Sequence, residues 1–349
     1  MKYIVWFSGG IDSTFVAYYL KNQGHEVLLV NLKNTVWYNK CCSVPIDLMK
    51  IANFLWLPLK IVDVVKEFKQ LVIDDFVENY LKWNTPNPCV NCNERVRFKV
   101  LEEIRQQMWY DFVSTGHYVK KEKIFDNVYS FSVPKDIWKD QSYMLYRLIK
   151  YQNILKHLDF PLFKFKKEEV KENLKKINIP LDTSKESQNI CFIPDDDYPR
   201  FIKQMKTINI PWWKIVDTNW NYLWEHKWLI YYTVWQRKWL NLNTNEKKYV
   251  VKIDWENNIL VVGDEKDLLS TKVKLAENII LLPWFDKNLF DKIYWKIRYK
   301  WKLEEVEQIE NRGVVFKKPL RAITPGQHLV LYWEKDWKLV VIWWWIIWV

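Results

Sequence analysis

The first third of the chain alternates short apolar runs with longer amphipathic stretches. An apolar run at 3–7 leads into a loop of serine and glycine, followed by an amphipathic stretch that stops at Gly24. Apolar runs bounded by turns are typical of buried strands, whereas a 3.6-residue apolar period is typical of helices. Further strands are predicted at 26–32, 59–62 and 112–115, and further helices at 44–55 and 94–107. This alternation predicts an α/β fold with a doubly wound parallel sheet.

After about residue 208 the pattern changes to short runs in which apolar and polar residues alternate. Many such runs at close spacing predict a β-barrel or a β-sandwich. They lie at 229–234, 249–253, 259–262, 292–299, 314–316, 329–332 and 338–341. A chain of 349 residues is long enough for two or three domains. We predict an α/β domain over 1–206, a small central β domain over 207–269 and a C-terminal β-barrel domain over 270–349.

The charge of the chain favours a polyanionic partner. Lysine and arginine number 53 against 42 acidic residues, which gives a formal net charge of +11 and a pI near 9.1. A positive surface of this kind attracts nucleic acid. A predicted helix at 164–177 carries lysines that either form a solvated face or contact phosphates: Lys164, Lys166, Lys167, Lys171, Lys175 and Lys176.

The apolar segments of the chain give no sign of export or of membrane insertion. No apolar run with a small-residue cleavage site follows Met1, and no stretch reaches the ~20 apolar residues that span a bilayer. We therefore expect a cytosolic protein without a membrane partner. In that compartment the five cysteines are expected as thiols, metal ligands or redox groups.

The composition is unusual in tryptophan and glycine. The chain has 23 Trp and 7 Gly, whereas Gly usually makes up about 7% of residues. Several Trp residues stand in turn-like or close-packed contexts that suit glycine, which alone takes a positive φ without penalty. We expect that a codon decoded as glycine in the source is written as Trp here, above all at Trp6, Trp83, Trp220, Trp235, Trp239 and Trp343 to Trp345. A truly Trp-rich chain is the alternative, and an intact mass of 42.9 kDa would support it.

The loop after the first predicted strand suits a phosphate group. It reads Ser8-Gly9-Gly10-Ile11-Asp12-Ser13 and leads into a helix, although it lacks the lysine of a Walker A loop. Its glycines let backbone N–H groups approach a ligand, and a helix N-terminus favours an anion. Lys33 and Gly116-His117 are expected near it, at the carboxyl ends of the strands. The loop resembles that of the PP-loop ATP pyrophosphatases, which split ATP into AMP and pyrophosphate. An ordinary glycine turn is the alternative.

A second motif presents a pair of cysteines. The segment from Thr85 to Asn93 contains two prolines followed by Cys89 and Cys92 in a C-x-x-C arrangement. Such a pair can bind a metal, exchange disulfides or hold an activated thiolate. A half zinc site is the alternative, but the sequence has no second Cys or His pair at conventional spacing. The distant Cys191 is the remaining candidate partner.

With these motifs, the chain resembles the tRNA-specific 2-thiouridylases over nearly its whole length. Besides the loop and the C-x-x-C segment, the matching segments are Cys41-Cys42-Ser43, Ser114 to Tyr118, Lys139 to Tyr143, Leu145-Tyr146, Ser187 to Ile193, Tyr231 to Leu240 and Arg321 to Gln327. Trp235, Trp239 and Trp343 to Trp345 stand where the family has glycine. The resemblance therefore supports the glycine hypothesis independently of composition.

The resemblance implies a role for each matching position. It implies an ATP site at Trp6 (glycine in the family), Phe7, Ser8, Gly9, Gly10, Ile11, Asp12, Ser13, Leu32 and Gly116. It implies contacts with the target base at Asn87, Pro88 and Cys89, and contacts with tRNA at His117, Lys139, Asp140, Gln141, Arg298, Tyr299 and Gln327. Cys92 would be the nucleophilic partner and Cys191 the persulfide carrier. Some members of the family have Asp in place of Cys89, and His117 taken alone is equally well a core or capping histidine.

The implied chemistry is sulfur transfer to C2 of the wobble uridine of tRNA, with ATP and Mg²⁺ as cofactors. The C2 oxygen is a poor leaving group, so ATP first adenylates it, and sulfur then attacks C2 and expels AMP. One source of sulfur is a persulfide on Cys191, loaded by a cysteine desulfurase or a sulfur relay protein. The other is sulfide on a [4Fe–4S] cluster held by Cys89, Cys92 and Cys191.

Other functions are compatible with some of these motifs. Amide-forming PP-loop ligases and 4-thiouridine synthases share the loop, but they need no C-x-x-C segment paired with a later cysteine. A non-catalytic RNA-binding protein would use the basic surface and the β domains alone. Turnover of ATP to AMP in the presence of tRNA separates the enzymes from this last alternative.

Overall fold

The chain forms two compact units. The computed structural model describes residues 1–34, 45–82, 84–182, 190–206, 213–226, 228–237, 240, 247–275, 292–299, 302–310, 313–321, 323–335 and 337–348. The first unit contains residues 1–74, 88–196 and 332–342, and the second contains residues 75–87, 197–331 and 343–349. Of the candidate site positions, Asn87, Arg298, Tyr299 and Gln327 belong to the second unit and the others to the first.

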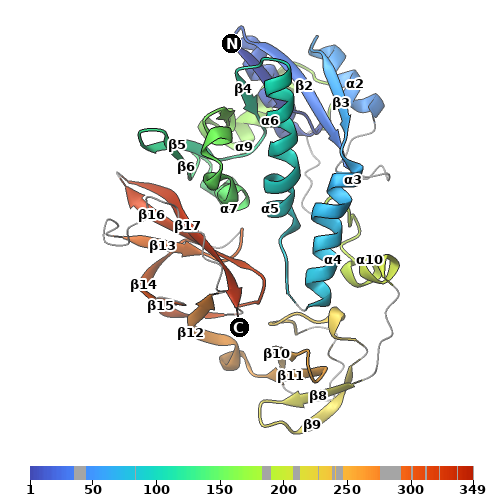
Figure 1. Ribbon diagram of the computed structural model, residues 1–349, viewed down its shortest axis with the longest axis vertical. Coiled ribbons are helices and arrows are strands. Elements are labelled where there is room, and N and C mark those ends of the chain that lie inside the picture. Colours follow the sequence, from blue (N-terminus) through green and yellow to red (C-terminus); the bar gives the residue numbers. More distant parts are fainter. Residues whose placement is uncertain are drawn as a thin grey trace. The chain divides into compact units, whose positions relative to one another are not determined.

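The first unit is built on a five-stranded parallel sheet (Figure 1). The strand order is β3-β2-β1-β4-β7, with β1 (Lys2–Trp6), β2 (Glu26–Lys33), β3 (Leu59–Asp63), β4 (Phe112–Ser114) and β7 (Leu158–Asp159). Tyr3 of β1 pairs with Val27 on one side and with Phe112 on the other, so the strand order reverses at β1. Sheets of this kind bind ligands beyond the carboxyl end of that strand. The predicted α/β fold is confirmed.

Helices cover this sheet because its central strands are apolar on both faces. Ile4 and Val5 of β1 are fully buried, as a covered parallel sheet requires. In the view of Figure 1, α6 lies in front of the sheet. The helices of this unit are α1 (Ile11–Asn22), α2 (Pro45–Phe54), α3 (Val65–Phe68), α5 (Pro88–Cys92), α6 (Phe98–Gln107), α7 (Ser142–Leu145), α8 (Gln152–Leu155) and α9 (Lys167–Lys176). Among the helices that the structure describes, none is long and apolar enough to cross a bilayer.

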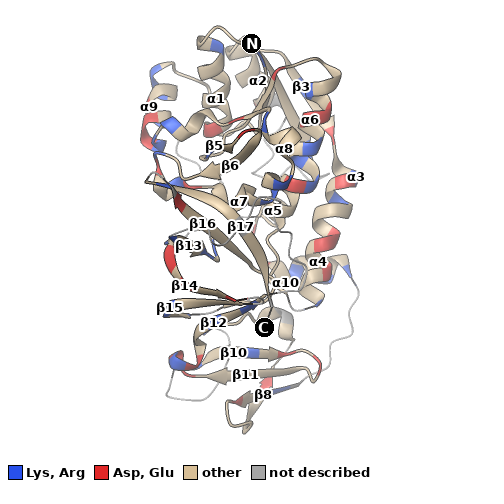
Figure 2. Cartoon of the chain, turned by 60° about the vertical axis from the view of Figure 1, so that its left-hand side comes forward, with Lys and Arg blue, Asp and Glu red and all other residues tan. Residues whose placement is uncertain are grey.

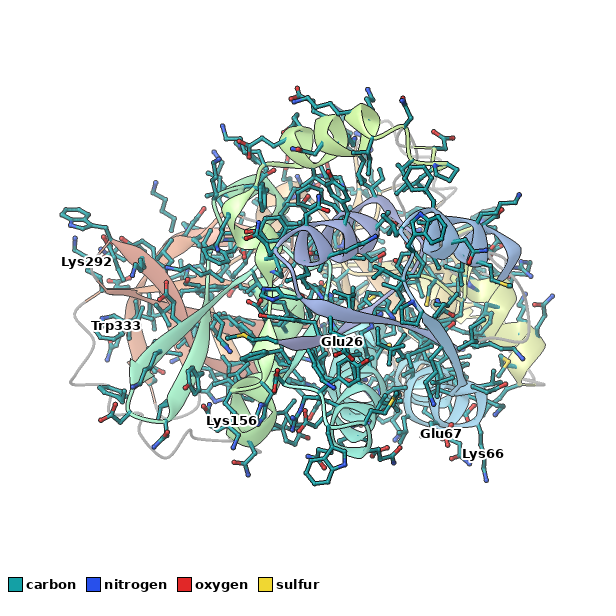
Figure 3. The ribbon with its side chains drawn as sticks, turned by 90° about the horizontal axis from the view of Figure 1, so that it is seen from above. Glu26, Lys66, Glu67, Lys156, Lys292 and Trp333 are labelled. Carbon is teal, nitrogen blue, oxygen red and sulfur yellow. The ribbon has the colours of Figure 1, made fainter. Side chains whose placement is uncertain are left out.

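Two helical stretches of the first unit contain π-helical turns. α3 continues into η1 (Lys69–Ile73), and α5 continues through η2 (Asn93–Arg97) into α6. The predicted helix at 94–107 is therefore longer than expected, and both cysteines of the C-x-x-C motif lie on it. π-helical turns are frequent at functional sites. Figure 3 shows Lys66 and Glu67 of α3 projecting outward from the ribbon, and both are exposed.

The first unit also contains a β-hairpin that the sequence pattern does not predict. β5 (Lys120–Phe125) and β6 (Val128–Ser132) pair in antiparallel register, and Ser132 also pairs with Val340. Ile124 is the one buried residue of β5, which otherwise carries lysine, glutamate and an exposed Phe125. A strand with so few buried positions lacks the alternation by which strands are recognised in a sequence.

The second unit is mainly β-structure, with α4 (Asp74–Leu81) and α10 (Tyr198–Met205) beside it. One sheet has the order β10-β11-β8-β9, with β8 (Trp213–Asp217), β9 (Tyr222–His226), β10 (Tyr249–Asp254) and β11 (Ile259–Gly263). The later strands of the chain are β12 (Leu269–Leu275), β13 (Ile293–Lys296), β14 (Glu304–Glu310), β15 (Gly313–Arg321), β16 (His328–Lys335) and β17 (Lys338–Trp348). Residues 332–342, at the end of β16 and the start of β17, are those assigned to the first unit. The later strands follow the order β12-β15-β14-β13-β16-β17, and β12 also pairs with β17, which closes a barrel. The predicted β-structure with a final barrel is confirmed, whereas the two boundaries between the three domains remain predictions.

One predicted strand of the second unit is wrong. Residues 229–234 contain the 3₁₀ turn η6 (Leu229–Tyr231) and the start of a turn at Val234. Leu229 and Tyr232 pack into the apolar core with residues of β8, β10 and β11. A short apolar run predicts burial, but it does not distinguish a strand from a buried turn.

Several Trp residues have the backbone geometry of glycine. The described Trp residues with positive φ are Trp56 (51°), Trp109 (56°), Trp220 (65°), Trp235 (78°) and Trp337 (63°). The other described non-glycine residues with positive φ are all Asn or Asp, which tolerate this region. A bulky side chain in this region is strained. The left-handed backbone predicted at Trp220 and Trp235 is therefore confirmed.

Other candidate glycine positions have ordinary surroundings. Trp344 and Trp345 lie in β17 and are 6% and 3% exposed, so both indoles are buried in the structure. Trp6 ends β1, and the guanidinium of Arg97 lies 3.6 Å from its ring centroid. Outside the described part of the chain lie the side chain of Trp343 and the whole of Trp83 and Trp239.

Replacing Trp337 by glycine is expected to stabilise the protein. Trp337 lies between β16 and β17 with its side chain 94% exposed, and its φ of 63° disfavours a bulky residue. Removing this strain contributes about 1–2 kcal/mol, which raises Tm by a few degrees. Thermal unfolding measures the change, with Trp138→Gly as the control because Trp138 is 82% exposed and has no positive φ. A Trp337→Gly protein that unfolds at or below the Tm of the parent would contradict the prediction.

Candidate active site

The loop at the carboxyl end of β1 is held by its own hydroxyl groups. Ser8 Oγ lies 3.1 Å from Ser13 Oγ, and Ser13 Oγ donates to the Gly10 carbonyl oxygen at 3.2 Å. Gly9 has a φ of 74°, which a side chain would disfavour. The N-cap residue of α1 is Gly10, which has no side chain to cap the first turn of the helix. The N–H groups at the start of α1 are therefore suited to an anionic group.

A second loop contacts the first because it carries a glycine. Gly116 follows β4, and a Cβ at this position would lie 2.8 Å from the nitrogen of Ser13 and 2.9 Å from the Cβ of Asp12. A side chain cannot approach the backbone this closely, so the contact requires glycine. The structure thus brings together two of the loops expected at this edge of the sheet. Three other candidate ATP positions are buried apolar residues: Phe7, Ile11 and Leu32.

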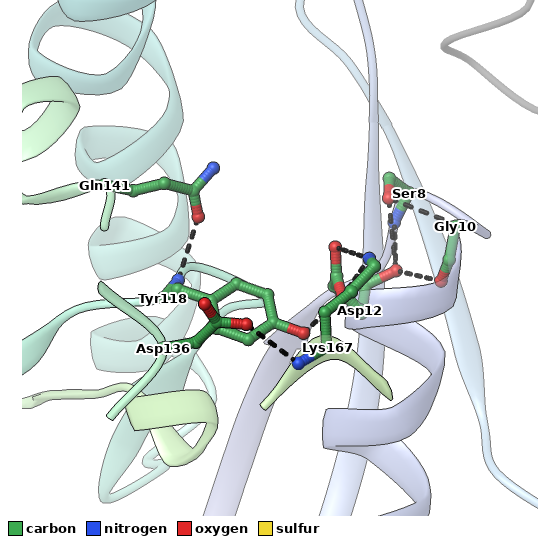
Figure 4. Close-up of polar contacts among 8 residues, drawn as sticks. Ser8, Gly10, Asp12, Tyr118, Asp136, Gln141 and Lys167 are labelled. Atoms are coloured by element: carbon green, nitrogen blue, oxygen red, sulfur yellow. Dashed lines mark hydrogen bonds and ion pairs between the residues drawn. The ribbon is translucent and has the colours of Figure 1, made fainter. Parts of the chain in front are cut away.

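A buried lysine lies against the loop (Figure 4). Lys167 is 4% exposed, and its Nζ lies 2.6 Å and 2.7 Å from the two carboxylate oxygens of Asp12. The Tyr118 hydroxyl donates to Asp12 Oδ1 at 3.0 Å, and the Lys167 N–H donates to Asp136 Oδ2 at 3.0 Å. Burial of an ammonium group requires a paired carboxylate, which Asp12 provides. The site therefore has a lysine beside the loop, although the loop itself contains none.

Lys167 is distinguished from the other lysines of its helix by its place on α9. It shares the buried face of the helix with Val170 and Leu174. Positions i, i+3 and i+7 lie on one side of a helix, so a lysine in this apolar series is directed inward. Figure 2 shows basic and acidic residues interleaved along α9. The spacing to Val170 and Leu174 is the signal that could have identified Lys167 from the sequence.

His117 is a buried, neutral histidine. It is 7% exposed, its ring centroid lies 6.0 Å from that of Trp6, and its Nδ1 lies 2.7 Å from Thr115 Oγ1. Burial, together with the charge of Arg97, lowers the pKa of His117 from 6.5 to about 3. The imidazole therefore contributes an aromatic face and a neutral ring near pH 7, and not a charge.

The depressed pKa of His117 predicts a loss of stability on acidification. The unfolded chain takes up a proton below pH 6.5, whereas the folded chain excludes it until about pH 3. Stability is therefore fully present above pH 6.5 and falls as the pH approaches 3. The free energy of unfolding in urea is measured at about pH 7.5 and at about pH 5. It should fall less for His117→Gln than for the parent, because the variant lacks this titrating group whereas all other groups titrate in both proteins. Parallel pH profiles for the two proteins would contradict this prediction.

The segment from Lys139 to Gln141 lies next to Tyr118, the residue that follows His117. The Tyr118 N–H donates to Gln141 Oε1 at 2.8 Å, and the Gln141 N–H donates to the Tyr118 carbonyl oxygen at 2.9 Å. Asp140 is buried and accepts a hydrogen bond from the backbone of the next helix. Tyr118 joins this segment to Asp12 and the loop (Figure 4). The positions that the resemblance assigns to tRNA in this unit are therefore adjacent.

The three cysteines of the expected sulfur chemistry are thiols in the structure. Cys89 and Cys92 lie on α5, where Cys92 is buried and Cys89 is partly exposed. Asn34, which directly follows β2, donates from Nδ2 to Cys191 Sγ at 3.8 Å. Cys191 therefore lies at the carboxyl edge of the parallel sheet, the edge that also carries the loop.

A buried acidic residue anchors the helical turn next to Cys92. Glu94 is 5% exposed, accepts a hydrogen bond from Arg147 Nη1 at 3.0 Å and pairs with Lys150. Burial opposes ionisation, but the hydrogen bond from Lys150 and the charge of Arg147 hold the pKa of Glu94 below its ordinary value. Arg147 also donates to Asn91 Oδ1 at 2.7 Å. The network fixes α5 and η2, and the sequence motifs do not reveal it because its members are scattered along the chain.

The geometry does not fit a metal cluster on the three cysteines. Within the described ranges, no group of three or more His, Cys, Asp or Glu side chains could hold a metal ion. A [4Fe–4S] cluster needs three or four thiolates gathered in one group. Among the described residues, Cys89, Cys92 and Cys191 are therefore not gathered as a cluster requires, and the persulfide mechanism remains a prediction.

In the second unit, two candidate tRNA positions meet at Arg298. Its Nε donates to Gln327 Oε1 at 3.1 Å, and its Nη2 donates to Thr324 Oγ1 at 3.2 Å. Its guanidinium lies 5.3 Å from the ring centroid of Trp235. Tyr299 is the next residue in the chain and is partly exposed. Arg298 and Gln327 thus form one polar cluster.

Family models match three successive parts of the chain. They are the tRNA methyl transferase HUP domain over residues 1–195, the tRNA methyl transferase PRC-barrel domain over residues 206–264 and the aminomethyltransferase beta-barrel domain over residues 285–339.

Similarity to individual proteins extends over nearly the whole chain. The chain is 40% identical over 350 residues to tRNA-specific 2-thiouridylase MnmA 1 of Caldanaerobacter subterraneus subsp. tengcongensis, with 95% of this chain and 94% of that protein covered. It is 39% identical over 349 residues to tRNA-specific 2-thiouridylase MnmA 2 of Thermoanaerobacter sp., with 94% and 93% covered. A solved complex of a 4-thiouridine synthetase with RNA and bound ATP is 18% identical, with a TM-score of 0.35 over 51% of this chain and 41% of that chain.

Proposed function

Because the chain belongs to the tRNA-specific 2-thiouridylase family, we propose that it is an ATP-dependent tRNA-uridine 2-sulfurtransferase. It adenylates the C2 oxygen of the wobble uridine and then replaces this oxygen by sulfur, with release of AMP and pyrophosphate. One observation carries the ATP step: the uncapped start of α1 adjoins a loop against which Lys167 is buried. Similarity over nearly the whole chain supports tRNA as the substrate.

The first step uses the loop. Backbone N–H groups and the hydroxyls of Ser8 and Ser13 bind the phosphates of ATP, and Lys167 offsets their charge. Mg²⁺ on a nucleotide needs one or two protein carboxylates, and Asp12 is the carboxylate at this loop. The metal supplies further neutralisation of phosphate charge. The C2 oxygen attacks the α-phosphorus, and pyrophosphate leaves with the electrons of the broken P–O bond.

The second step uses the cysteines. The terminal sulfur of a persulfide on Cys191 attacks C2, and AMP leaves with the electrons of the C2–O bond. The Cys92 thiolate then attacks the Cys191 sulfur, which breaks the S–S bond and leaves the transferred sulfur on C2. A Cys92–Cys191 disulfide forms, and a thiol reductant reopens it. Cys89, together with Asn87 and Pro88, contacts the target base.

Sulfur loading needs a partner protein, and tRNA binding involves all three domains. A cysteine desulfurase or a sulfur relay protein loads Cys191, and the reaction takes place in the cytoplasm, where thiol reductants are available. Residues 1–206 carry out the chemistry and contribute Lys139 to Gln141 to tRNA binding. Residues 207–269 and 270–349 extend the tRNA-binding surface.

Release of AMP and pyrophosphate that depends on tRNA tests this proposal. Purified protein is incubated with ATP and Mg²⁺, with and without unmodified tRNA, and nucleotides are separated by chromatography. A non-catalytic RNA-binding protein would leave ATP intact, and an amide-forming ligase would require its own amine substrate. AMP formation at the same rate with and without tRNA would argue against the proposed reaction.

A further inference from the structure

The second unit contains a cleft that the proposed reaction steps do not use. It has a volume of about 690 Å³, and its lining includes Tyr231, Trp235, Gln236, Arg237, Tyr249 and Arg321. Among the residues that the structure describes, the lining combines guanidinium groups with aromatic rings and includes no acidic side chain. Phosphate and unpaired bases are the groups that such a combination binds.

Hydrogen bonds hold the turn that precedes Arg237. The Thr233 N–H donates to Gln236 Oε1 at 3.1 Å, so the turn is closed by its own side chain. The Trp235 N–H donates to the Val250 carbonyl oxygen at 2.7 Å, and the Val250 N–H donates to the Gln236 carbonyl oxygen at 2.9 Å. The turn is thus fixed to β10, and Arg237 extends from a rigid support.

Arg321 adds a second guanidinium to the cleft. The Arg321 guanidinium carbon lies 5.2 Å from the ring centroid of Tyr249, and Arg321 Nη1 lies 3.0 Å from Glu265 Oε1. The Arg321 and Glu265 side chains are 44% and 60% exposed, so this ion pair contributes little stability and can give way to a phosphate. Lys203 of α10 lies 4.9 Å from the ring centroid of Tyr231 and places a third cation beside the lining.

The cleft adjoins the cluster of Arg298 and Gln327. Trp235 belongs to the lining, and the Arg298 guanidinium lies 5.3 Å from its ring centroid. Arg298 in turn is hydrogen-bonded to Gln327. A cation therefore lies beside each of two lining rings, with Arg298 at Trp235 and Lys203 at Tyr231.

We propose that this cleft binds a segment of RNA, with a backbone phosphate on Arg237 and Arg321 and an unpaired base against the aromatic rings. Guanidinium groups bind phosphate through paired hydrogen bonds, and every base offers a face for stacking. The neighbouring cations and the net charge of +11 favour a long polyanion over a small anion. That this RNA is tRNA rests on the proposed function.

The proposed RNA site does not depend on the indole of Trp235. This residue has a φ of 78°, the conformation for which glycine is expected. With glycine at this position, the cleft retains both arginines together with Tyr231 and Tyr249. The stacking surface then comes from the two tyrosines.

Charge-removing variants test the cleft. Arg237→Gln and Arg321→Gln are compared with Lys214→Gln, which removes an exposed charge from β8 outside the lining. Filter binding of unmodified tRNA, without ATP, gives Kd at several salt concentrations. Each arginine variant is expected to bind on the order of tenfold more weakly and to lower the slope of log K against log salt by about one. Lys214→Gln is expected to change Kd by less than about twofold.

Two results decide between this site and the proposed reaction. Kd and salt slope equal to those of Lys214→Gln in both arginine variants would overturn the RNA site, whether or not the protein makes 2-thiouridine. Weaker binding in folded arginine variants, combined with absence of 2-thiouridine in the parent protein, would retain the RNA site and refute the proposed reaction. Thermal unfolding establishes that each variant is folded.

Discussion

Replacing Cys191 by serine is expected to abolish 2-thiouridine formation while tRNA-dependent AMP release remains detectable. In the proposed mechanism the adenylation step uses the loop, Asp12 and Lys167, whereas Cys191, which lies beside Asn34, serves only sulfur delivery. A serine hydroxyl cannot carry a persulfide. The adenylated uridine is then hydrolysed by water, which returns uridine and AMP. Nucleotide chromatography measures AMP, and mass spectrometry of digested tRNA measures 2-thiouridine.

Cys42→Ser is the matched control for the Cys191 variant, because it makes the same replacement at a cysteine without an assigned role. It is expected to retain both products. A normal yield of 2-thiouridine from Cys191→Ser would rule out sulfur delivery by this residue, and loss of AMP release in a folded Cys191→Ser protein would show that the two steps are not separable.

Replacing Asp12 by asparagine is expected to stop adenylation itself, so that AMP and 2-thiouridine are lost together. Asp12 is the carboxylate at the loop, and it holds Lys167 Nζ at 2.6 Å and 2.7 Å. Asparagine keeps the shape but removes the charge that positions Lys167 and that would bind Mg²⁺ on the nucleotide. A loss of at least about a hundredfold in the rate of AMP release is expected, because groups that stabilise charge in a transition state have effects of this size.

Tyr118→Phe is the control for the Asp12 variant. It removes the hydroxyl that donates to Asp12 Oδ1 at 3.0 Å and leaves the carboxylate and Lys167 in place. A loss of less than about tenfold is expected, since a neutral hydrogen bond contributes about 1 kcal/mol. AMP release at the parental rate from folded Asp12→Asn would show that the ATP site lies elsewhere.

Four of the five strands of the parallel sheet could be predicted because they are encoded locally, whereas the two-residue strand β7 is not predicted. β1, β2 and β3 are apolar runs bounded by turns, and no end of their predicted ranges differs from the structure by more than one residue. β5 and β14 are not predicted, because most of their residues are charged or exposed and their pairing is decided by neighbouring strands. The apolar run at 229–234 shows the converse, since it is buried without forming a strand.

The site could be predicted only as far as motifs are continuous in the sequence. The Ser8–Ser13 loop is such a motif, and its contact with Gly116 follows from the sheet order. The ion pair of Lys167 with Asp12 joins residues 155 positions apart, and the Glu94–Arg147 contact joins residues 53 apart. Contacts of this range depend on tertiary packing. For Lys167, the helical spacing with Val170 and Leu174 is a local pattern in the sequence that indicates burial.

The most direct measurement is mass spectrometry of nucleosides from tRNA incubated with the protein, ATP, Mg²⁺ and a sulfur source. The expected product is 2-thiouridine, at a yield that falls to background when either ATP or the sulfur source is omitted. Unchanged uridine under the complete conditions, or 4-thiouridine or a methylated uridine in place of 2-thiouridine, would contradict the proposed sulfur transfer to C2.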